Sequence, residues 1–288
     1  MLKVIEKTRI WFGISLIIIL IGVFSMATKG LELGIDFKGG TVTQISIKQN
    51  FDKTDIDNIV KKYTSDFQSN KVNNTSIEIK SANISSADTS LMVKDIKAKY
   101  KDAALTDQES IGASIGTETR NKAIEAVFIA CIAILIYVSI RFEFKFAMAA
   151  IISLVHDVLI MLAFYSFFQI SVDSSFIAAA LTVIGYSVHD TIVVFDRIRE
   201  NQKYIRGADV TILANASITQ TMARSINTVL TVLITLTAVY ILVPNIRNFS
   251  LPLLVGVLSG GYSSIFIASP FWVIFKNRGR KIKVNNAK

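Results

Sequence analysis

An acidic residue inside a strongly apolar segment is the feature of this chain most able to do chemistry. The segment 174–195 is long and apolar, yet it contains Asp190 shortly before the charged run 196–200. A carboxylate inside a bilayer costs at least ~2.5–3.5 kcal/mol, so a membrane segment that keeps one needs a use for it. The sequence therefore predicts an ion pathway in which Asp190 binds a proton.

Arg224 is the candidate partner of Asp190, and it stands at the start of the apolar segment 225–243. Its helical face continues through the polar residues Thr228, Thr231 and Thr235. An arginine at the depth of Asp190 could hold that carboxylate ionised against the cost of burial, so that small movements would switch its protonation. Alternatively, Arg224 extends to the membrane surface and Asp190 only hydrogen-bonds between helices. Asn227, close to Arg224, fits either interpretation.

Two histidines and a second aspartate complete the set of polar candidates. His156 and Asp157 lie about ten residues into the segment 146–168, ~15 Å deep and close to the middle of the bilayer. They could form a second protonation station or a pair that only holds helices together, and the structural role is the preferred interpretation. His189 adjoins Asp190 in sequence but points roughly 100° away from it around the helix.

Several kinds of chemistry are excluded by patterns that the sequence lacks. No glycine-rich loop ends in Lys-Ser or Lys-Thr, so nothing is expected to bind ATP phosphates. No Cys and His spacing suits a metal ion, and both histidines lie in apolar segments, which argues against a hydrolytic triad. We therefore expect no cofactor, no metal and no covalent catalysis. Dispersed basic residues without interleaved aromatics argue against nucleic acid as a partner.

Six apolar segments are long enough to cross a bilayer, since ~20 apolar residues span a ~30 Å hydrocarbon core. They are 10–28, 123–140, 146–168, 174–195, 225–243 and 250–275. The first could be a signal peptide, but its apolar run exceeds the ~7–15 residues that such peptides use. We expect an uncleaved first helix within residues 1–28 and five more helices within 123–275, hence an α-helical polytopic membrane protein.

The distribution of charge predicts which side of the membrane each part faces. Residues 29–122 carry 14 basic and 13 acidic side chains, and the rest of the chain carries 17 basic and 9 acidic, from totals of 31 and 22. Positive charge near spans marks the cytoplasmic side. Both termini, including the basic tail 276–288, are therefore expected in the cytoplasm, and 29–122 is expected to be extracytoplasmic.

The extracytoplasmic loop 29–122 is long enough for a small α+β domain. Periodicity predicts a strand, a helix, a strand, a short candidate strand and a helix, at 41–47, 54–67, 75–79, 91–93 and 94–104. This order is compatible with half of a ferredoxin-like sandwich.

Small residues mark two places where backbones could approach closely. Gly112 and Gly116, just before the second apolar segment, could form a hinge or docking strip, or they could be turn glycines of a linker. The last apolar segment has small residues at every fourth position, which are Gly256, Gly260, Ser264 and Ala268. That face permits close packing against another helix, either in this chain or in a partner subunit.

Five motifs lie in order along the chain. They are LGIDFKGGT (33–41), ESIGASIG (109–116), RFEFKFAMAAIISLVHDVLIMLAF (141–164), ALTVIGYSVHDTIVVFDRIREN (180–201) and MARSINTVLTVL (222–233). Together they closely resemble the SecF family of the bacterial Sec protein-export apparatus, within the resistance-nodulation-division superfamily of proton-driven membrane proteins.

The resemblance implies a multi-pass protein of the bacterial cytoplasmic membrane that joins a SecD-like subunit in a twelve-span complex. Such a complex uses the proton motive force to help pull unfolded, translocating polypeptide outward from the Sec channel. The family ties an Asp on span four and an Arg at the start of span five to proton movement, and these match Asp190 and Arg224. It commonly has Asn where this chain has His189. The motif at Asp36, Phe37, Gly39 and Gly40 would couple the external domain to the membrane.

The expected mechanism is a motion of the external domain relative to the membrane as Asp190 binds and releases protons. One charge moving through ~100 mV yields ~2.3 kcal/mol, which is enough to bias a two-state motion. Two rivals stay open. An independent proton-coupled exporter of small molecules or lipids would need a substrate cavity, and a non-conducting structural subunit would tolerate the loss of Asp190.

Overall fold

The computed structural model describes residues 1–72, 74–82, 84–204, 209–243 and 246–285, with side chains described as far as Asn277. The last three residues of the basic tail lie outside this description. The chain divides into two compact units. We name them after the positions that the sequence predicts for them. The membrane unit comprises Met1–Glu32, Ala126–Ile170 and Ser175–Lys288, and the external unit comprises Leu33–Glu125 and Ser171–Ser174.

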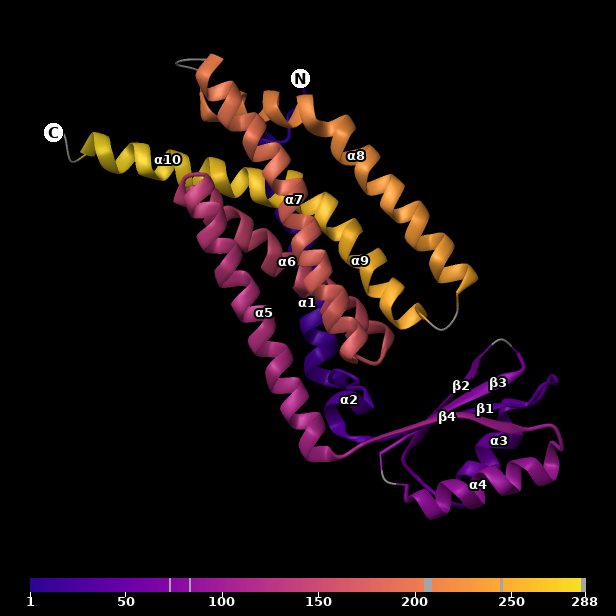
Figure 1. Ribbon diagram of the computed structural model, residues 1–288. Helices are drawn as coiled ribbons and strands as arrows, with labels where there is room; N and C mark the ends of the chain where they lie inside the picture. The colour runs from indigo at the N-terminus through magenta and orange to yellow at the C-terminus, as the bar shows by residue number, and fades with distance from the viewer. Residues whose placement is uncertain (73, 83, 205–208, 244–245, 286–288) are drawn as a thin grey trace. The chain divides into compact units, whose positions relative to one another are not determined.

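The described chain contains six helical stretches that are long and apolar enough to cross a membrane, which confirms the predicted polytopic fold (Figure 1). Five of them are α1 (Thr8–Lys29), α5 (Ala113–Arg141), α6 (Phe144–Phe168), α7 (Ser174–Tyr204) and α8 (Val210–Leu242). The sixth joins α9 (Arg247–Ser263), the π-helical turn η3 (Ser264–Ala268) and α10 (Ser269–Asn285). A short 3-10 turn, η1 (Ile5–Lys7), precedes α1.

The helices differ sharply in how much of their apolar length is covered. In α6, α7 and the sixth span, 56%, 50% and 61% of the most apolar window is buried, compared with 6% in α5 and in α8. The polar candidates Asp157 and Asp190 lie on the covered helices α6 and α7. Packing therefore shields both carboxylates from the surroundings of the unit.

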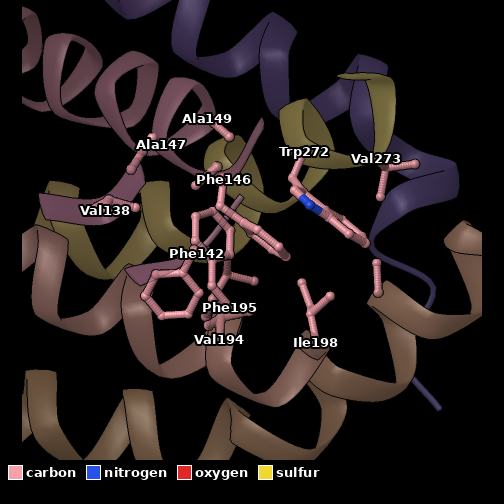
Figure 2. Packing of buried hydrophobic residues seen from close by; sticks show 14 of the residues in the cluster. Val138, Phe142, Phe146, Ala147, Ala149, Val194, Phe195, Ile198, Trp272 and Val273 are labelled. Atoms are coloured by element: carbon pink, nitrogen blue, oxygen red, sulfur yellow. The ribbon is translucent and has the colours of Figure 1, made fainter. Parts of the chain in front are cut away.

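An aromatic cluster joins three of these helices (Figure 2). Phe146 of α6 stacks on Trp272 of α10, with ring centroids 5.0 Å apart and planes 15° apart. Phe195 of α7 packs against Phe146 at 4.7 Å, and Phe142 packs against it at 5.9 Å. Buried aromatic side chains give large contact areas, so this cluster fixes how α6, α7 and α10 meet.

The N-terminal residues are bound to the beginning of α8. The Asn215 side-chain carbonyl accepts hydrogen bonds from the backbone N–H groups of Val4 and Ile5 at 3.0 and 3.1 Å. Its amide donates to Glu6 at 2.8 Å. Asn215 thus satisfies otherwise free backbone donors ahead of α1, and it holds the start of the chain beside the start of α8.

The external unit contains a four-stranded antiparallel sheet in the order β2-β3-β1-β4. Its elements are β1 (Gly40–Ser46), α3 (Lys53–Val60), β2 (Phe67–Val72), β3 (Ser76–Ser81), α4 (Ser86–Lys99) and β4 (Ala104–Ile111). The order βαββαβ is that of a ferredoxin-like fold, which confirms the predicted α+β class. The unit also contains the single-turn helix α2 (Ile35–Lys38), immediately before β1.

One face of the sheet forms the core of the external unit, and α3 and α4 cover that face (Figure 1). Residues of β1 and β3 alternate between buried and half-buried positions, so Ile45, Ile77 and Ile79 point inward. The two helices contribute Ile56 and Met92 among others to this cluster. Asp52 caps α3, where its carboxylate accepts the Thr54 N–H at 2.9 Å.

Several predicted details of this unit are wrong. The segment 91–93 is no strand but part of α4, whose buried face contains Met92, Val93 and Ile96. The helix expected over 54–67 ends at Val60, and the helix expected over 94–104 begins earlier and ends at Lys99. Neither β2 nor β4 was predicted, because FQSNKV and ALTDQESI lack an apolar alternation. The sandwich is therefore complete, where only half had been expected.

Candidate functional site

Asp190 lies near the middle of α7 and is 4% exposed. Its Oδ1 accepts a hydrogen bond from the hydroxyl of Ser225 on α8 at 2.9 Å. Its Oδ2 accepts a hydrogen bond from the hydroxyl of Ser264, at the start of η3. The carboxylate therefore binds two hydroxyls from two other spans, and it ties α7 to both of them.

Arg224 does not contact Asp190 in this chain. It is exposed on α8, and within the described residues Asp190 has no ion pair at 4.0 Å or less. The neighbouring Ser225 takes the inward position, because successive helical residues point about 100° apart. Asn227 is exposed as well. The sequence correctly predicted that Asp190 meets this part of α8. The residue that binds it is Ser225 rather than Arg224.

Two other residues of α7 frame Asp190. His189 is exposed, in line with its expected direction around the helix. The Tyr186 hydroxyl, one turn earlier, is buried without a hydrogen-bond partner in the part of the chain that the structure describes. A buried hydroxyl is normally satisfied by protein or water. The surroundings of Asp190 therefore contain a polar group that can accept or donate one more hydrogen bond.

Asp157 of α6 is fully buried and accepts four hydrogen bonds. Its Oδ1 binds the Ser259 hydroxyl at 2.6 Å and His156 Nδ1 at 3.1 Å. Its Oδ2 binds the hydroxyls of Ser187 at 2.6 Å and Ser263 at 2.8 Å. His156 also reaches α1, where its Nε2 lies 3.0 Å from the Ser15 hydroxyl. The His156–Asp157 pair thus connects α1, α6, α7 and α9.

Two consecutive serines, where α9 meets the π-helical turn η3, bind different carboxylates, because successive helical residues point about 100° apart. Ser263 binds Asp157 on α6, and Ser264 binds Asp190 on α7. The Ser269 hydroxyl donates to the Ser264 carbonyl at 3.1 Å, which satisfies a backbone acceptor inside the irregular turn. Such π-turns within α-helices are frequent at functional sites.

The small residues of the last span lie at internal helix contacts. A Cβ added at Gly256 would stand 2.3 Å from Val183 Cγ2, and one added at Gly260 would stand 3.1 Å from Ser187 Cβ. Ser264 binds Asp190, and Ala268 is fully buried. The structure therefore places this face against α7 and α6. That close approach brings two serines of α9 to Asp157 and Ser264 of η3 to Asp190.

Sequence reasoning missed most of the hydroxyl groups around the carboxylates, namely Ser15, Ser187, Ser225, Ser259 and Ser263. A signal for some of them exists in the sequence. Ser259 and Ser263 are four residues apart, so they share a helical face next to the Gly256 and Gly260 face. Serine donors on that face could have been matched to a buried carboxylate.

The motif Asp36, Phe37, Gly39 and Gly40 lies in and after α2 within the external unit. Gly39 and Gly40 have φ values of +80° and +139°, which favour glycine. A Cβ at Gly39 would stand 2.7 Å from Ala113 Cα, and a Cβ at Gly116 would stand 2.8 Å from Gly39 N. The strip with Gly112 and Gly116 is therefore a docking surface for the motif rather than a free linker.

Asp36 makes a contact that the sequence did not predict. Its Oδ2 accepts a hydrogen bond at 2.8 Å from the backbone N–H of Ser174, the first residue of α7. Beside it, the Gly34 N–H donates to the Val172 carbonyl at 2.8 Å. Ser171–Ser174 thereby belongs to the external unit, although α7 continues from it into the membrane unit.

Comparison with known proteins identifies the family. Residues 92–278 match the family model described as Protein export membrane protein SecD/SecF, C-terminal, and residues 24–50 match the SecD/SecF GG Motif. A protein translocase subunit SecF of Sebaldella termitidis is 38% identical over 93% of this chain and 90% of its own length. The protein translocase subunit SecDF of Bacillus subtilis is 36% identical over 98% of this chain.

Solved structures agree with these matches. A crystal structure of SecDF from Thermus thermophilus, described as a translocon-associated membrane protein, superposes with a TM-score of 0.86 at 32% identity over 95% of this chain. A second SecDF structure, in a super-membrane-facing form, gives a TM-score of 0.75 at 31% identity. The chain spans 38 to 40% of the SecDF chains that it matches. This family consists of transporters and not of enzymes. Since the matches cover nearly the whole length of this chain, it belongs to the SecD/SecF family of protein translocase subunits and corresponds to SecF.

Proposed function

We propose that this SecF-type subunit uses the proton motive force, together with a SecD-like partner, to promote protein export across the bacterial cytoplasmic membrane. The observation that supports this proposal most directly is Asp190, a buried carboxylate held by two hydroxyls on neighbouring spans. A carboxylate kept at such a cost inside a span points to ion movement. Proton uptake by Asp190 is the chemical step of the proposed function.

In the proposed switch, either a bound proton or the Arg224 guanidinium neutralises the charge of the Asp190 carboxylate. A neutral carboxylic acid is compatible with the two hydroxyl contacts of Asp190, whereas a nearby cation would favour the ionised form. Arg224 precedes the inward-facing Ser225 by one residue, so a rotation of α8 by about 100° would exchange them. Proton release from Asp190 and approach of Arg224 would then occur together, and they would change how α7 and α8 pack.

The partner is proposed from the polar face that α8 leaves uncovered. Its most apolar window is only 6% buried, and its exposed side chains include Arg224, Asn227, Thr231 and Thr235. Such side chains normally face protein or water inside a membrane. The SecDF relatives carry the SecF-like part as about two fifths of a longer chain. A separate SecD-like subunit is therefore the proposed neighbour, and the Sec channel and the unfolded translocating polypeptide are its proposed co-partners.

The proposed topology places both termini in the cytoplasm and residues 29–122 outside. The charge distribution supports this, with 17 basic and 9 acidic residues beyond 29–122. The structure supports a common side for the two ends, because η1 contacts both α8 and α10. The proposed parts are residues 1–28, the external domain 29–122, the spans within 123–275 and the tail 276–288.

The test compares Asp190→Asn with Asp196→Asn, a change of the same chemistry on the same helix. Asp196 is 46% exposed and pairs with Arg199, so its loss should cost little. Gradient-dependent protein export would be measured in membrane vesicles that contain the SecD-like partner, and co-purification would show whether the complex is intact. We expect Asp190→Asn to abolish the stimulation by the gradient within an intact complex, and Asp196→Asn to retain it.

Two other outcomes would replace the proposal. Unchanged stimulation in Asp190→Asn would leave a non-conducting structural subunit as the better description. Gradient-driven transport of a small molecule or lipid that depends on Asp190, with protein export unaffected, would indicate an independent exporter.

A further inference from the structure

We propose that His156 and Asp157 form a second proton-binding site, separate from Asp190, in which the imidazole Nε2 takes up the proton. Binding itself does not depend on the proposed function, but its consequence for export does. The inference starts from the complete set of hydrogen bonds around the pair, which assigns a different role to each of the two side chains.

Asp157 has the surroundings of an ionised carboxylate. The hydroxyls of Ser187, Ser259 and Ser263 donate to its two oxygens at 2.6 to 2.8 Å. His156 Nδ1 occupies a fourth position at 3.1 Å. An ionised carboxylate only accepts hydrogen bonds, and the three hydroxyls together with an N–H at Nδ1 would fill four such positions. Asp157 is therefore the fixed negative charge of the site.

His156 is oriented by that charge. Because Asp157 accepts, Nδ1 must donate, and the neutral imidazole then has its lone pair on Nε2. Nε2 lies 3.0 Å from the Ser15 hydroxyl, which donates to it in this state. A neighbouring carboxylate that fixes the tautomer in this way exposes a basic nitrogen on the opposite side of the ring. Nε2 is accordingly the atom that binds the proton.

Ser15 can serve both protonation states without moving its oxygen. Its Oγ lies 3.0 Å from His156 Nε2 and 3.4 Å from the Tyr262 hydroxyl, which itself donates to the Trp11 carbonyl at 2.8 Å. When Nε2 gains a proton from a hydronium ion or a protonated water chain, the new N–H donates to Ser15. The Ser15 O–H then turns to Tyr262, and water is left behind.

A cavity provides space for the incoming proton carrier. It has a volume of about 410 Å³ between α1, α6 and α9, and Ser15, His156, Ser259 and Tyr262 form its polar wall. The remaining wall is apolar, including Ile14 and Phe164. His156 and Ser15 both line this mostly apolar space, so it is the route by which we propose that a proton carrier reaches Nε2. Asp157 is not among the lining residues and is fully buried.

The groups that face the pair include few other charges. From α1 and α9 the described contacts are Ser15, Tyr262 and the two serines of α9, of which only Tyr262 is titratable. From α7 the contact is Ser187, and Asp190 follows one turn later on that helix. Proton binding converts a net charge of about −1 at the pair to neutral. That change is electrostatically significant for Asp190 in a low-dielectric interior.

The two sites also share structural elements. Ser187 binds Asp157 one turn before Asp190 on α7. Ser263 and Ser264 are consecutive residues, and they bind Asp157 and Asp190, respectively. A shift of α7 or of η3 that follows protonation at one carboxylate must therefore reposition hydroxyls at the other. This arrangement couples the two proton-binding sites.

The experiment uses the fact that the chain has only two histidines. The full-length subunit, in complex with its SecD-like partner in lipid nanodiscs, would be labelled with ¹⁵N-histidine and followed by NMR as the pH is varied. His189→Asn assigns the remaining signals to His156. We expect the Nδ1–H tautomer on the alkaline side and one protonation step of His156 as the pH is lowered. Asp157→Asn is expected to abolish that step over the pH range scanned.

Several outcomes would overturn the inference. An imidazole that is charged at every pH, or neutral at every pH, would make the pair a purely structural contact between helices. A neutral form with the proton on Nε2 would exclude the proposed acceptor atom. Titration that is unchanged in Asp157→Asn would remove Asp157 from the site.

A second measurement connects binding to export. We expect His156→Gln to flatten the pH dependence of gradient-driven export, with the complex intact, whereas the parent and Asp196→Asn should keep it. An unaltered profile would overturn the coupling between the two sites. The NMR titration does not depend on export, so a failed Asp190→Asn test would reject the proposed function while leaving the second site measured in its own right.

Discussion

A methyl group added at Gly22 would test the tightest contact in the membrane unit. Gly22 of α1 faces Ala163 of α6, and an added Cβ would stand 2.1 Å from Ala163 Cβ and 2.6 Å from its Cα. Carbon atoms pack at ~3.5–4.0 Å, so the shortfall is ~1.4–1.9 Å. Neither atom can avoid the other by a rotamer change, because both are fixed to the backbone. Gly22→Ala must therefore push α1 and α6 apart.

The magnitude follows from that separation. Overpacking in a dense interior costs ~1–3 kcal/mol. A shift of this size also stretches the bonds between α1 and α6 beyond hydrogen-bonding distance, namely Ser15 to His156 at 3.0 Å and Ser25 to Ser166 at 3.1 Å. Hydrogen bonds between membrane helices contribute ~0.6 kcal/mol each. Gly22→Ala is therefore expected to lower the free energy of unfolding by about 2–4 kcal/mol.

The assay is equilibrium unfolding of the purified subunit in mild detergent, with Gly13→Ala as the matched control. Gly13 lies on the same helix, and a Cβ there would meet no atom within 4 Å. Alanine is a better helix former than glycine by up to ~1 kcal/mol, so this change should be neutral or stabilising. Equal effects of the two substitutions would show that α1 and α6 do not approach as closely as the structure has them.

Four further changes test the external unit. Asp36→Ala removes the acceptor at the start of α7 and should open its first turn by about 1 kcal/mol, seen as roughly fivefold faster amide exchange there. Asp52→Ala should do the same to α3 and leave α7 unchanged. The hydrogen bond from Lys99 lowers the pKa of Asp55 below its ordinary 3.8, so this pair stabilises the unit above that pH and ceases to do so as the pH falls through the lowered value. Asp55→Asn should reduce the thermal unfolding temperature at neutral pH but not at strongly acid pH. Gly116→Ala should displace the backbone of the glycine motif, seen as changed amide NMR shifts at its contact.

Each of these expectations has an outcome that contradicts it. Slower or unchanged exchange at the start of α7 in Asp36→Ala would mean that the carboxylate does not hold that amide. An Asp55→Asn effect that persists at acid pH would point to lost packing rather than lost charge. Unshifted amide signals in Gly116→Ala would remove the proposed docking of the motif on α5.

Hydrophobicity predicted the membrane part of the fold well, because each spanning helix appears in the sequence as one long run of apolar residues. The external domain was harder, since its strands depend on partners far away in the sequence. In β2 only Ser69 is buried, and β4 is exposed over most of its length, so neither shows the alternation of a half-buried strand. Conversely, the apolar run at Leu91 to Val93 resembles a strand locally, and only the position of Ile96 shows the helical period.

The candidate site was predictable as to residue type but not as to partner. Depth along a helix identified Asp190 and the entry of α8, yet rotation about the helix axis decides whether Arg224 or Ser225 faces inward, and one sequence does not determine that rotation. The π-helical turn is a second reason. It changes the direction of the side chains that follow it in the span, which the fourfold spacing of small residues does not reveal.

The hydrogen bond between Asp36 and Ser174 attaches the first residue of α7 to the glycine motif. The helix runs unbroken for 31 residues, and Asp190 stands 16 residues beyond Ser174, or ~24 Å along the axis. An intact helix transmits axial displacement over that length with little compression, because its backbone hydrogen bonds lie parallel to the axis. A shift of less than an ångström at the buried carboxylate would therefore arrive almost undiminished at the anchor of the glycine motif. Under the proposed function, helix geometry would set the size of this displacement, and the Asp36 carboxylate would transmit it.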